Sequence, residues 1–119
     1  MPGRSRVERG VAGEALAEAF LRARGYRIVE RNFRCKVGEI DIVARDASTL
    51  VFAEVRSRSS SRHGRAAESI TADKQRQIAR VASAYIAIRR PTFQTCRFDV
   101  VDITAGDIDL IKDAFRLGL

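Results

Sequence analysis

The segment that decides the expected fold is Gly38-Glu39-Ile40-Asp41-Ile42-Val43-Ala44-Arg45, followed by Leu50-Val51-Phe52-Ala53-Glu54-Val55-Arg56. Apolar and polar side chains alternate in both halves, a pattern typical of β-strands that bury one face. The residues between the halves, Asp46-Ala47-Ser48, favour a turn. We therefore predict an antiparallel hairpin over residues 39–56.

The register of this hairpin follows from its turn. A four-residue loop over residues 46–49 pairs Arg45 with Leu50. Continued outward, the same register sets two pairs of polar residues face to face: Asp41 opposite Glu54, and Glu39 opposite Arg56. Ile40, Ile42 and Ala44 then share the apolar face, and a slip of one residue would mix carboxylates into it. The hairpin is thus expected to gather three acids and one arginine on one side.

These acids suggest a metal site. Close carboxylates on a partly buried surface repel one another, and a cation relieves that cost. Mg²⁺ or Mn²⁺ accepts one or two carboxylates together with water and phosphate oxygens, and can activate water at a phosphodiester. The neighbouring Arg56 would clamp a phosphate oxygen. The alternative is a set of cross-strand ion pairs on a solvated sheet face, and spacing alone does not choose between the two.

The rest of the chain is expected to add two helices and three strands. The first helix ends near Arg24, and its apolar stripe is predicted to comprise Ala12, Leu16, Ala19, Phe20 and Ala23. Thr71 is expected to cap the second helix, whose predicted stripe comprises Ile78, Val81, Ala82 and Tyr85. The other extended segments are residues 26–33, 95–103 and 108–115. The order α-β-β-β-α-β-β implies an α/β fold with a mixed central sheet flanked by helices.

Size and composition bound the function. A chain of 119 residues suits one domain over residues 1–119, and its net charge of +7 favours a polyanionic partner. No apolar run approaches the roughly 20 residues that cross a bilayer, and the N-terminus lacks the apolar stretch of a signal peptide. We therefore expect a cytoplasmic protein without a membrane partner. Cys35 and Cys96 stand far apart without a CxxC pattern, so a zinc site is not expected.

Several motifs, taken in order along the chain, resemble those of one bacterial family. Besides the two halves of the hairpin they are Gly13-Glu14-x-x-Ala17, Arg56-x-Arg58-Ser59-Ser60, Thr71-x-x-Lys74-Gln75, Arg97-Phe98-Asp99-Val100-Val101 and Ile111-Lys112-x-Ala114-Phe115. Over nearly its whole length the chain resembles the small YraN-type family of uncharacterised nuclease-like proteins. These are similar in their core to archaeal Holliday-junction resolvases. The resemblance implies a restriction-endonuclease-like fold and a Mg²⁺- or Mn²⁺-dependent endonuclease acting on branched or structured DNA.

The resemblance also implies roles for individual residues. Asp41 and Glu54 match the metal-binding pair, with the carbonyl of Val55 as a third ligand. Glu14 matches the acid of the first helix that often completes such sites, although a solvated helix glutamate explains it equally well. Glu39 becomes a peripheral acid or an ion-pair partner of Arg56. Lys74 and Gln75 would lie near the site, in contact with phosphate or water. Apart from the resemblance, the polar loop offers Arg58, Arg62 and Arg65 as contacts for phosphate. The alternative for all five is an ordinary solvated side chain.

Arg56 departs from the nuclease motif, which usually has lysine at this position. Arginine supplies positive charge, but its pKa above about 12 prevents it from accepting a proton at neutral pH. Two functions therefore stay open: a metal-dependent DNA endonuclease, and a nucleic-acid-binding module that keeps the nuclease scaffold without turnover. A third is a protein-interaction domain with an acidic partner. By analogy with resolvases we expect a two-fold homodimer, although nothing in the sequence identifies its interface.

Overall fold

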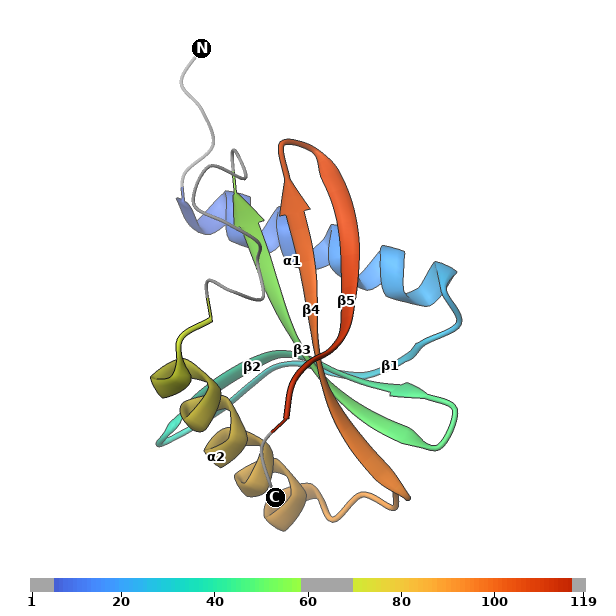
Figure 1. Ribbon diagram of the computed structural model, residues 1–119, viewed down its shortest axis with the longest axis vertical. Helices are drawn as coiled ribbons and strands as arrows, with labels where there is room; N and C mark the ends of the chain where they lie inside the picture. Colours follow the sequence, from blue (N-terminus) through green and yellow to red (C-terminus); the bar gives the residue numbers. More distant parts are fainter. Residues whose placement is uncertain (1–5, 59–69, 117–119) are drawn as a thin grey trace.

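A computed structural model describes residues 6–58 and 70–116 of the chain, and for residues 6–12 the backbone alone. The elements are α1 (Arg6–Ala23), β1 (Arg27–Cys35), β2 (Gly38–Asp46), β3 (Thr49–Arg58), α2 (Ala72–Arg89), β4 (Thr95–Thr104) and β5 (Asp107–Phe115). The predicted α/β fold and its element order are confirmed (Figure 1). Within the described ranges, no helix is both long and apolar enough to span a bilayer.

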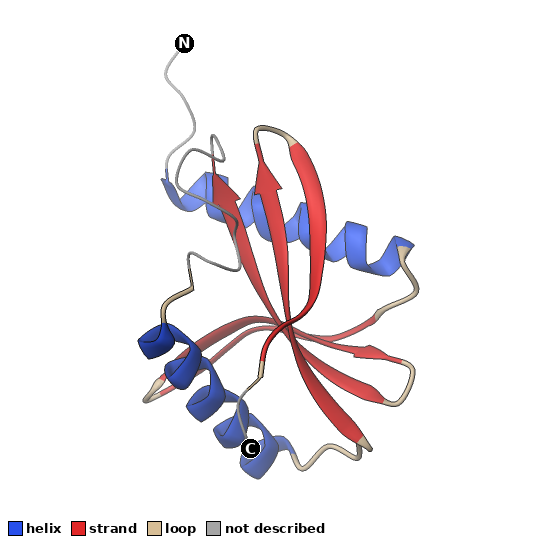
Figure 2. Ribbon diagram, viewed as in Figure 1, coloured by secondary structure: helices blue, strands red, loops and turns tan. Residues whose placement is uncertain are grey.

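The strands form one twisted sheet in the order β1-β2-β3-β4-β5. Neighbouring strands are antiparallel except β3 and β4, which run parallel because α2 connects them. The twist is large: β1 and β2 run across the view in Figure 2, whereas β4 and β5 run along it. The central strand, β3, has a neighbour on each side, so residues in its middle are the most enclosed of the sheet.

One face of the sheet is covered by α2. The stripe predicted for this helix is confirmed, because Ile78, Val81, Ala82 and Tyr85 are all buried. They pack against apolar residues of the sheet that include Val43, Phe52 and Phe98. The predicted cap is also present, since the Thr71 hydroxyl accepts a hydrogen bond from the backbone N–H of Lys74 at 3.2 Å. This cap fixes the position of Lys74 in the first turn of α2.

The opposite face is covered by α1, and the stripe predicted for that helix is wrong. The helix buries Ala17 and Leu21, whereas Leu16 is 51% exposed. Ala19 and Ala23 are also exposed, Phe20 is half-buried, and the side chain of Ala12 lies outside the described residues. An alanine-rich helix offers little apolar contrast between its faces, so the pattern could not choose between them.

The turn of the β2–β3 hairpin is tighter than predicted, but the register is the same. Arg45 pairs with Leu50, as predicted, and Asp46 pairs with Thr49. Two residues therefore make the connection, and Ala47 adopts a φ of +55° to close it. Because the pairing is unchanged, the side chains that the sequence assigned to each face of β3 lie where they were expected.

The far end of the hairpin departs from the prediction. The ladder between β2 and β3 ends at Ile42–Ala53, one rung before the predicted pair of Asp41 and Glu54. Ile42 packs on the α1 side of the sheet, whereas Ile40 packs with the cluster on the α2 side. The predicted common face for these two isoleucines is thus wrong, because the alternation of β2 breaks between them. The break lies at the candidate site.

Candidate functional site

A side chain closes the break in the β2–β3 ladder. Extended by two rungs, the register would pair Val55 with Ile40. Instead the backbone N–H of Val55 donates to Asp41 Oδ2 at 2.8 Å. The N–H and C=O groups of one strand residue point to the same side, so the Val55 carbonyl faces the same opening as Asp41. The break thus gathers a carboxylate and a backbone oxygen beside Glu54.

Asp41 and Glu54 form a carboxyl pair with little access to water. Glu54 is 8% exposed and Asp41 is half-buried. Burial raises the pKa of Glu54 to about 8, and the neighbouring charge of Asp41 adds to the effect. Burial likewise raises the pKa of Asp41, while the N–H of Val55 and a hydrogen bond from Glu54 oppose the rise. The pair therefore favours keeping one proton over carrying two negative charges.

Two cations act on this pair. The charge of Lys74 lowers the pKa of both acids, and the charge of Arg56 lowers that of Glu54. Among the described residues, Glu54 Oε1 and Arg56 Nε are buried without a hydrogen-bond partner. Buried polar atoms in folded proteins nearly always have partners, so an acceptor and a donor left together favour a ligand between them. A cation suits the glutamate oxygen, and an anion suits the arginine nitrogen.

The oxygen donors fit a hard divalent cation. Two carboxylates and one backbone carbonyl are ligands that Mg²⁺ and Mn²⁺ accept. In the part of the chain that the structure describes, no three His, Cys, Asp or Glu side chains come together as a metal-binding group. An ion held by Asp41 and Glu54 would therefore complete its coordination with water or substrate oxygens. Mg²⁺ sites commonly keep several waters and bind phosphate in this way.

The other predicted acids do not join the pair. Glu39 lies opposite Arg34 of β1 and forms an ion pair with it at 2.9 Å, not with Arg56. This differs from the prediction because β2 keeps its pairing with β1 where it leaves β3. Glu14 is half-buried on α1, the helix on the opposite face of the sheet from Lys74. Neither acid belongs to a three-acid group among the described residues.

The residues predicted to contact nucleic acid fall into three groups. The charge of Lys74 acts on the acid pair. Arg58 forms an ion pair with Asp102 at 3.3 Å, and the side-chain amide of Gln75 donates to the Ile70 carbonyl at 3.1 Å. Arg62 and Arg65 lie outside the described residues. Lys74 is thus the predicted contact that the structure brings nearest to the chemistry.

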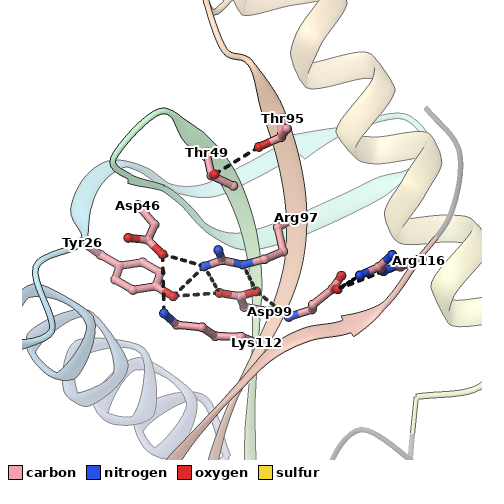
Figure 3. Close-up of polar contacts among 9 residues, drawn as sticks. Tyr26, Asp46, Thr49, Thr95, Arg97, Asp99, Lys112 and Arg116 are labelled. Atoms are coloured by element: carbon pink, nitrogen blue, oxygen red, sulfur yellow. Dashed lines mark hydrogen bonds and ion pairs between the residues drawn. The ribbon is translucent and has the colours of Figure 1, made fainter.

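Sequence reasoning missed a second polar cluster, centred on Asp99 (Figure 3). The Asp99 side chain is completely buried. It accepts hydrogen bonds from Arg97 at 2.8 and 2.9 Å, from the Tyr26 hydroxyl at 3.0 Å and from the N–H of Asp113 at 3.0 Å. Arg97 also donates to Asp46 at 3.0 Å. A signal was present in the sequence, since Arg97 and Asp99 flank Phe98 next to the apolar residues Val100 and Val101 of β4.

This cluster is structural. Both carboxylate oxygens of Asp99 have donors, so no acceptor is left for a ligand. Burial and the charge of Asp99 raise the pKa of Tyr26 above its usual value, so the phenol stays protonated and keeps donating. The cluster joins β4 to β5, to the β2–β3 turn and to the segment after α1. It therefore fixes the sheet on the face opposite the acid pair.

Fold and site together define a class of protein. A five-stranded mixed sheet between two helices, in this element order, is consistent with a compact nuclease-like fold. The model of the uncharacterised protein family UPF0102, the YraN family, matches residues 13–103, and the chain belongs to this family. The family resemblance drawn from the motifs is thereby confirmed.

Relatives in several bacteria match most of the chain. A UPF0102 protein of Hahella chejuensis is 54% identical over 95 residues, which cover 80% of this chain and 77% of the relative. One from Symbiobacterium thermophilum is 50% identical over 112 residues, covering 90% of this chain and 95% of the relative. One from Syntrophus aciditrophicus is 45% identical over 112 residues, covering 91% and 88%. The similarity therefore extends over the hairpin, both helices and β4.

Proposed function

We propose that this protein is a Mg²⁺- or Mn²⁺-dependent endonuclease that hydrolyses phosphodiester bonds in branched or otherwise structured DNA. The observation that carries the proposal is the buried Oε1 of Glu54, which has no partner among the described residues and lies beside Asp41. An acid pair with a raised pKa and an unsatisfied oxygen favours a cation over an ion-pair network. The net charge of +7 supports a polyanionic substrate.

Each residue of the site has a distinct task in this proposal. Asp41, Glu54 and the carbonyl of Val55 would hold the metal, which supplies an activated water and stabilises charge on the phosphate when bound. Arg56 binds a phosphate oxygen through the guanidinium that has an unpartnered Nε. Lys74 lies at the start of α2, and its charge acts on both acids of the pair. Arg56 thus binds and orients the phosphate, while Lys74 stabilises negative charge at the acid pair.

The proposal extends to location and assembly. DNA lies in the bacterial cytoplasm, and we place the protein there. Two strands of a branched DNA present two scissile bonds, so we propose a homodimer with one site for each strand. Sedimentation with and without a four-way junction would measure the assembly directly. A strict monomer on the junction would remove the homodimer from the proposal and leave the site unchanged.

The test is a cleavage assay with the full-length protein on labelled duplex, nicked, flapped and four-way-junction DNA. We expect product from at least one branched substrate with Mn²⁺, and none with EDTA. Asp41→Asn, purified in parallel, controls for contaminating nucleases and should give no product. Equal cleavage by wild type and Asp41→Asn, or cleavage that persists in EDTA, would contradict the proposal.

A second candidate, a binding module without turnover, is favoured by Arg56. We expect Arg56→Lys to cleave about tenfold faster than wild type, because lysine can position and deprotonate water. This increase is smaller than the full rate contribution of a general base. Single-turnover rates on the best branched substrate measure this. Arg34→Lys, at an exposed ion pair on β1, is the matched control and should leave the rate unchanged. An inactive wild type with an active Arg56→Lys would establish the binding module instead.

A further inference from the structure

Arginines line a continuous hollow where α2 ends. One part, of about 590 Å³, lies between the start of β1, the end of β2 and the end of α2. A second part, of about 600 Å³, lies between the 91–94 loop and the β2–β3 turn. The two parts share Arg45, Pro91 and Thr92. We call the combined hollow the arginine trough; its cationic residues are Arg27, Arg45, Arg89 and Arg90.

The charges of the trough are unbalanced. Glu30 is the one acid among its described lining residues, and both of its oxygens accept hydrogen bonds from Arg89, at 3.0 and 2.9 Å. Within the described ranges, Arg27, Arg45 and Arg90 form no ion pair. Arg27 and Arg45 also lie directly opposite each other in the β1–β2 ladder. Like charges in that position destabilise a sheet, and a bound anion would relieve the repulsion.

A purely structural explanation covers only part of the trough. Cations near a helix C-terminus interact favourably with its dipole, which accounts for Arg89 and Arg90 at the end of α2. Arg27 and Arg45 belong to strands and gain nothing from that dipole. Arg45 is moreover half-buried, so its charge is less screened by water than that of a surface residue. The case for a ligand therefore rests on these two residues.

The far wall of the trough presents an aromatic ring. The backbone N–H of Gln94 donates to the Ser48 carbonyl at 3.4 Å, and the Ser48 hydroxyl donates to the Gln94 side-chain oxygen at 3.3 Å. These bonds hold the 91–94 loop against the β2–β3 turn. Phe93, in the same loop, remains 36% exposed. An exposed aromatic ring beside arginines is the arrangement on which unpaired nucleic-acid bases stack.

We propose that the arginine trough binds the phosphate backbone of an unpaired nucleic-acid segment, with one base stacked on Phe93. The choice of nucleic acid as the ligand rests on the proposed function. The charge imbalance of the trough is a separate observation that does not depend on that function. The trough lies at the opposite end of α2 from Lys74, a helix about 27 Å long by its 18 residues. It therefore contacts the substrate away from the bond that is cut, and selects DNA that carries a single-stranded segment.

The test is binding of a labelled strand of about 30 nucleotides, and of its duplex, to the full-length protein in EDTA. We expect Arg27→Ser/Arg45→Ser/Arg90→Ser to bind the strand at least tenfold more weakly at about 50 mM salt. Its slope of log K against log salt should fall by about 2, since each phosphate contact contributes about 0.7. Phe93→Ala should weaken single-strand binding about tenfold and duplex binding less than about twofold.

A matched triple variant, Arg22→Ser/Arg34→Ser/Arg80→Ser, removes the same charge from exposed positions on α1, β1 and α2. We expect it to lose less than about threefold in affinity. This loss measures the non-specific electrostatic attraction, which depends on net charge and is the same for both triple variants. Equal weakening by both triples would overturn the inference. Thermal melts establish that each variant folds. As a second measurement on wild type, the strand should slow hydrogen exchange at residues 27–30 and 92–94, and unchanged exchange there would also overturn it.

The two proposals fail separately. Strand binding in EDTA is measured without metal at the acid pair, so it is independent of cleavage. Normal trough binding without any metal-dependent cleavage would reject the nuclease and leave the trough. Cleavage with no effect of the trough triple on binding would reject the trough and leave the nuclease.

Discussion

The Glu54→Gln variant is expected to be more stable than wild type in EDTA at pH 9. It is also expected to lose metal-dependent cleavage by at least about 100-fold, which corresponds to about 3 kcal/mol of transition-state stabilisation. Glutamine keeps the size of the side chain and can still donate to Asp41, but it carries no charge that burial disfavours. The gain in stability and the loss of activity share one cause, the buried carboxylate.

The direction of the stability change follows from proton binding. The pKa of Glu54 is about 8 in the folded protein against an ordinary value of 4.5, so the folded state binds more protons between these values. The contribution of Glu54 to the stability of wild type is therefore full below about pH 4.5 and is lost as the pH rises through 8. Between pH 6 and 9 the loss is about 3 kcal/mol, and Glu54→Gln avoids it. Urea unfolding at several pH values measures the difference.

Metal should offset this difference in stability. At a Mn²⁺ concentration about 100 times its Kd, wild type gains about 2.7 kcal/mol, whereas Glu54→Gln, having lost a ligand, gains little. Asp107→Asn is the control, because Asp107 is an exposed carboxylate at the start of β5, and its effect should stay within about 0.5 kcal/mol. A Glu54→Gln protein that unfolds like wild type at pH 9, with or without Mn²⁺, would remove the physical basis of the site.

The second large effect concerns Asp99. Asp99→Ala is expected to destabilise the fold by about 3–5 kcal/mol, because it leaves Arg97 partly buried without the carboxylate that both of its nitrogens contact. Tyr26→Phe removes one hydrogen bond to the same carboxylate and should cost about 1–3 kcal/mol. Denaturant unfolding at pH 7 measures both.

The double variant separates a network from independent contacts. The combined cost of Asp99→Ala and Tyr26→Phe should be smaller than the sum of the two, because both remove the same hydrogen bond. Asp107→Asn, an exposed carboxylate at the start of β5, serves as the control and should change stability by less than about 0.5 kcal/mol. A cost for Asp99→Ala below about 1 kcal/mol would show that β4 is fixed by its apolar contacts alone.

The hairpin was predictable because its two strands alternate strictly near the turn. A shift of one residue would have buried charged side chains, so one register satisfied the pairs from Arg45–Leu50 to Ile42–Ala53. The end of the ladder was not predictable. Asp41 substitutes its side chain for a backbone acceptor there, and period-two reasoning assumes that the ladder continues. The same assumption placed Glu39 opposite Arg56, whereas the structure gives it Arg34.

Other features depend on contacts that no local pattern encodes. The hydrogen bond from Tyr26 to Asp99 joins residues 73 positions apart, and neither residue signals the other in the sequence. On α1, the alanines on both faces left the orientation undetermined until the helix packed on the sheet. The arginine trough was missed for a similar reason: its cations come from β1, β2 and the end of α2, and only the fold brings them together.

The parallel pairing of β3 with β4 also has a consequence for synthesis on the ribosome. It joins Thr49 with Thr95 and continues to Arg58 with Thr104, so every contact spans a large loop. Contacts of this kind form late in folding, because closing the loop costs conformational entropy before the contacts stabilise the chain. Asp41 and Glu54 are translated in the first half of the chain, but the strand that encloses Glu54 emerges near the end. A nascent chain therefore carries both acids long before it carries a site, and synthesis of β4 completes it.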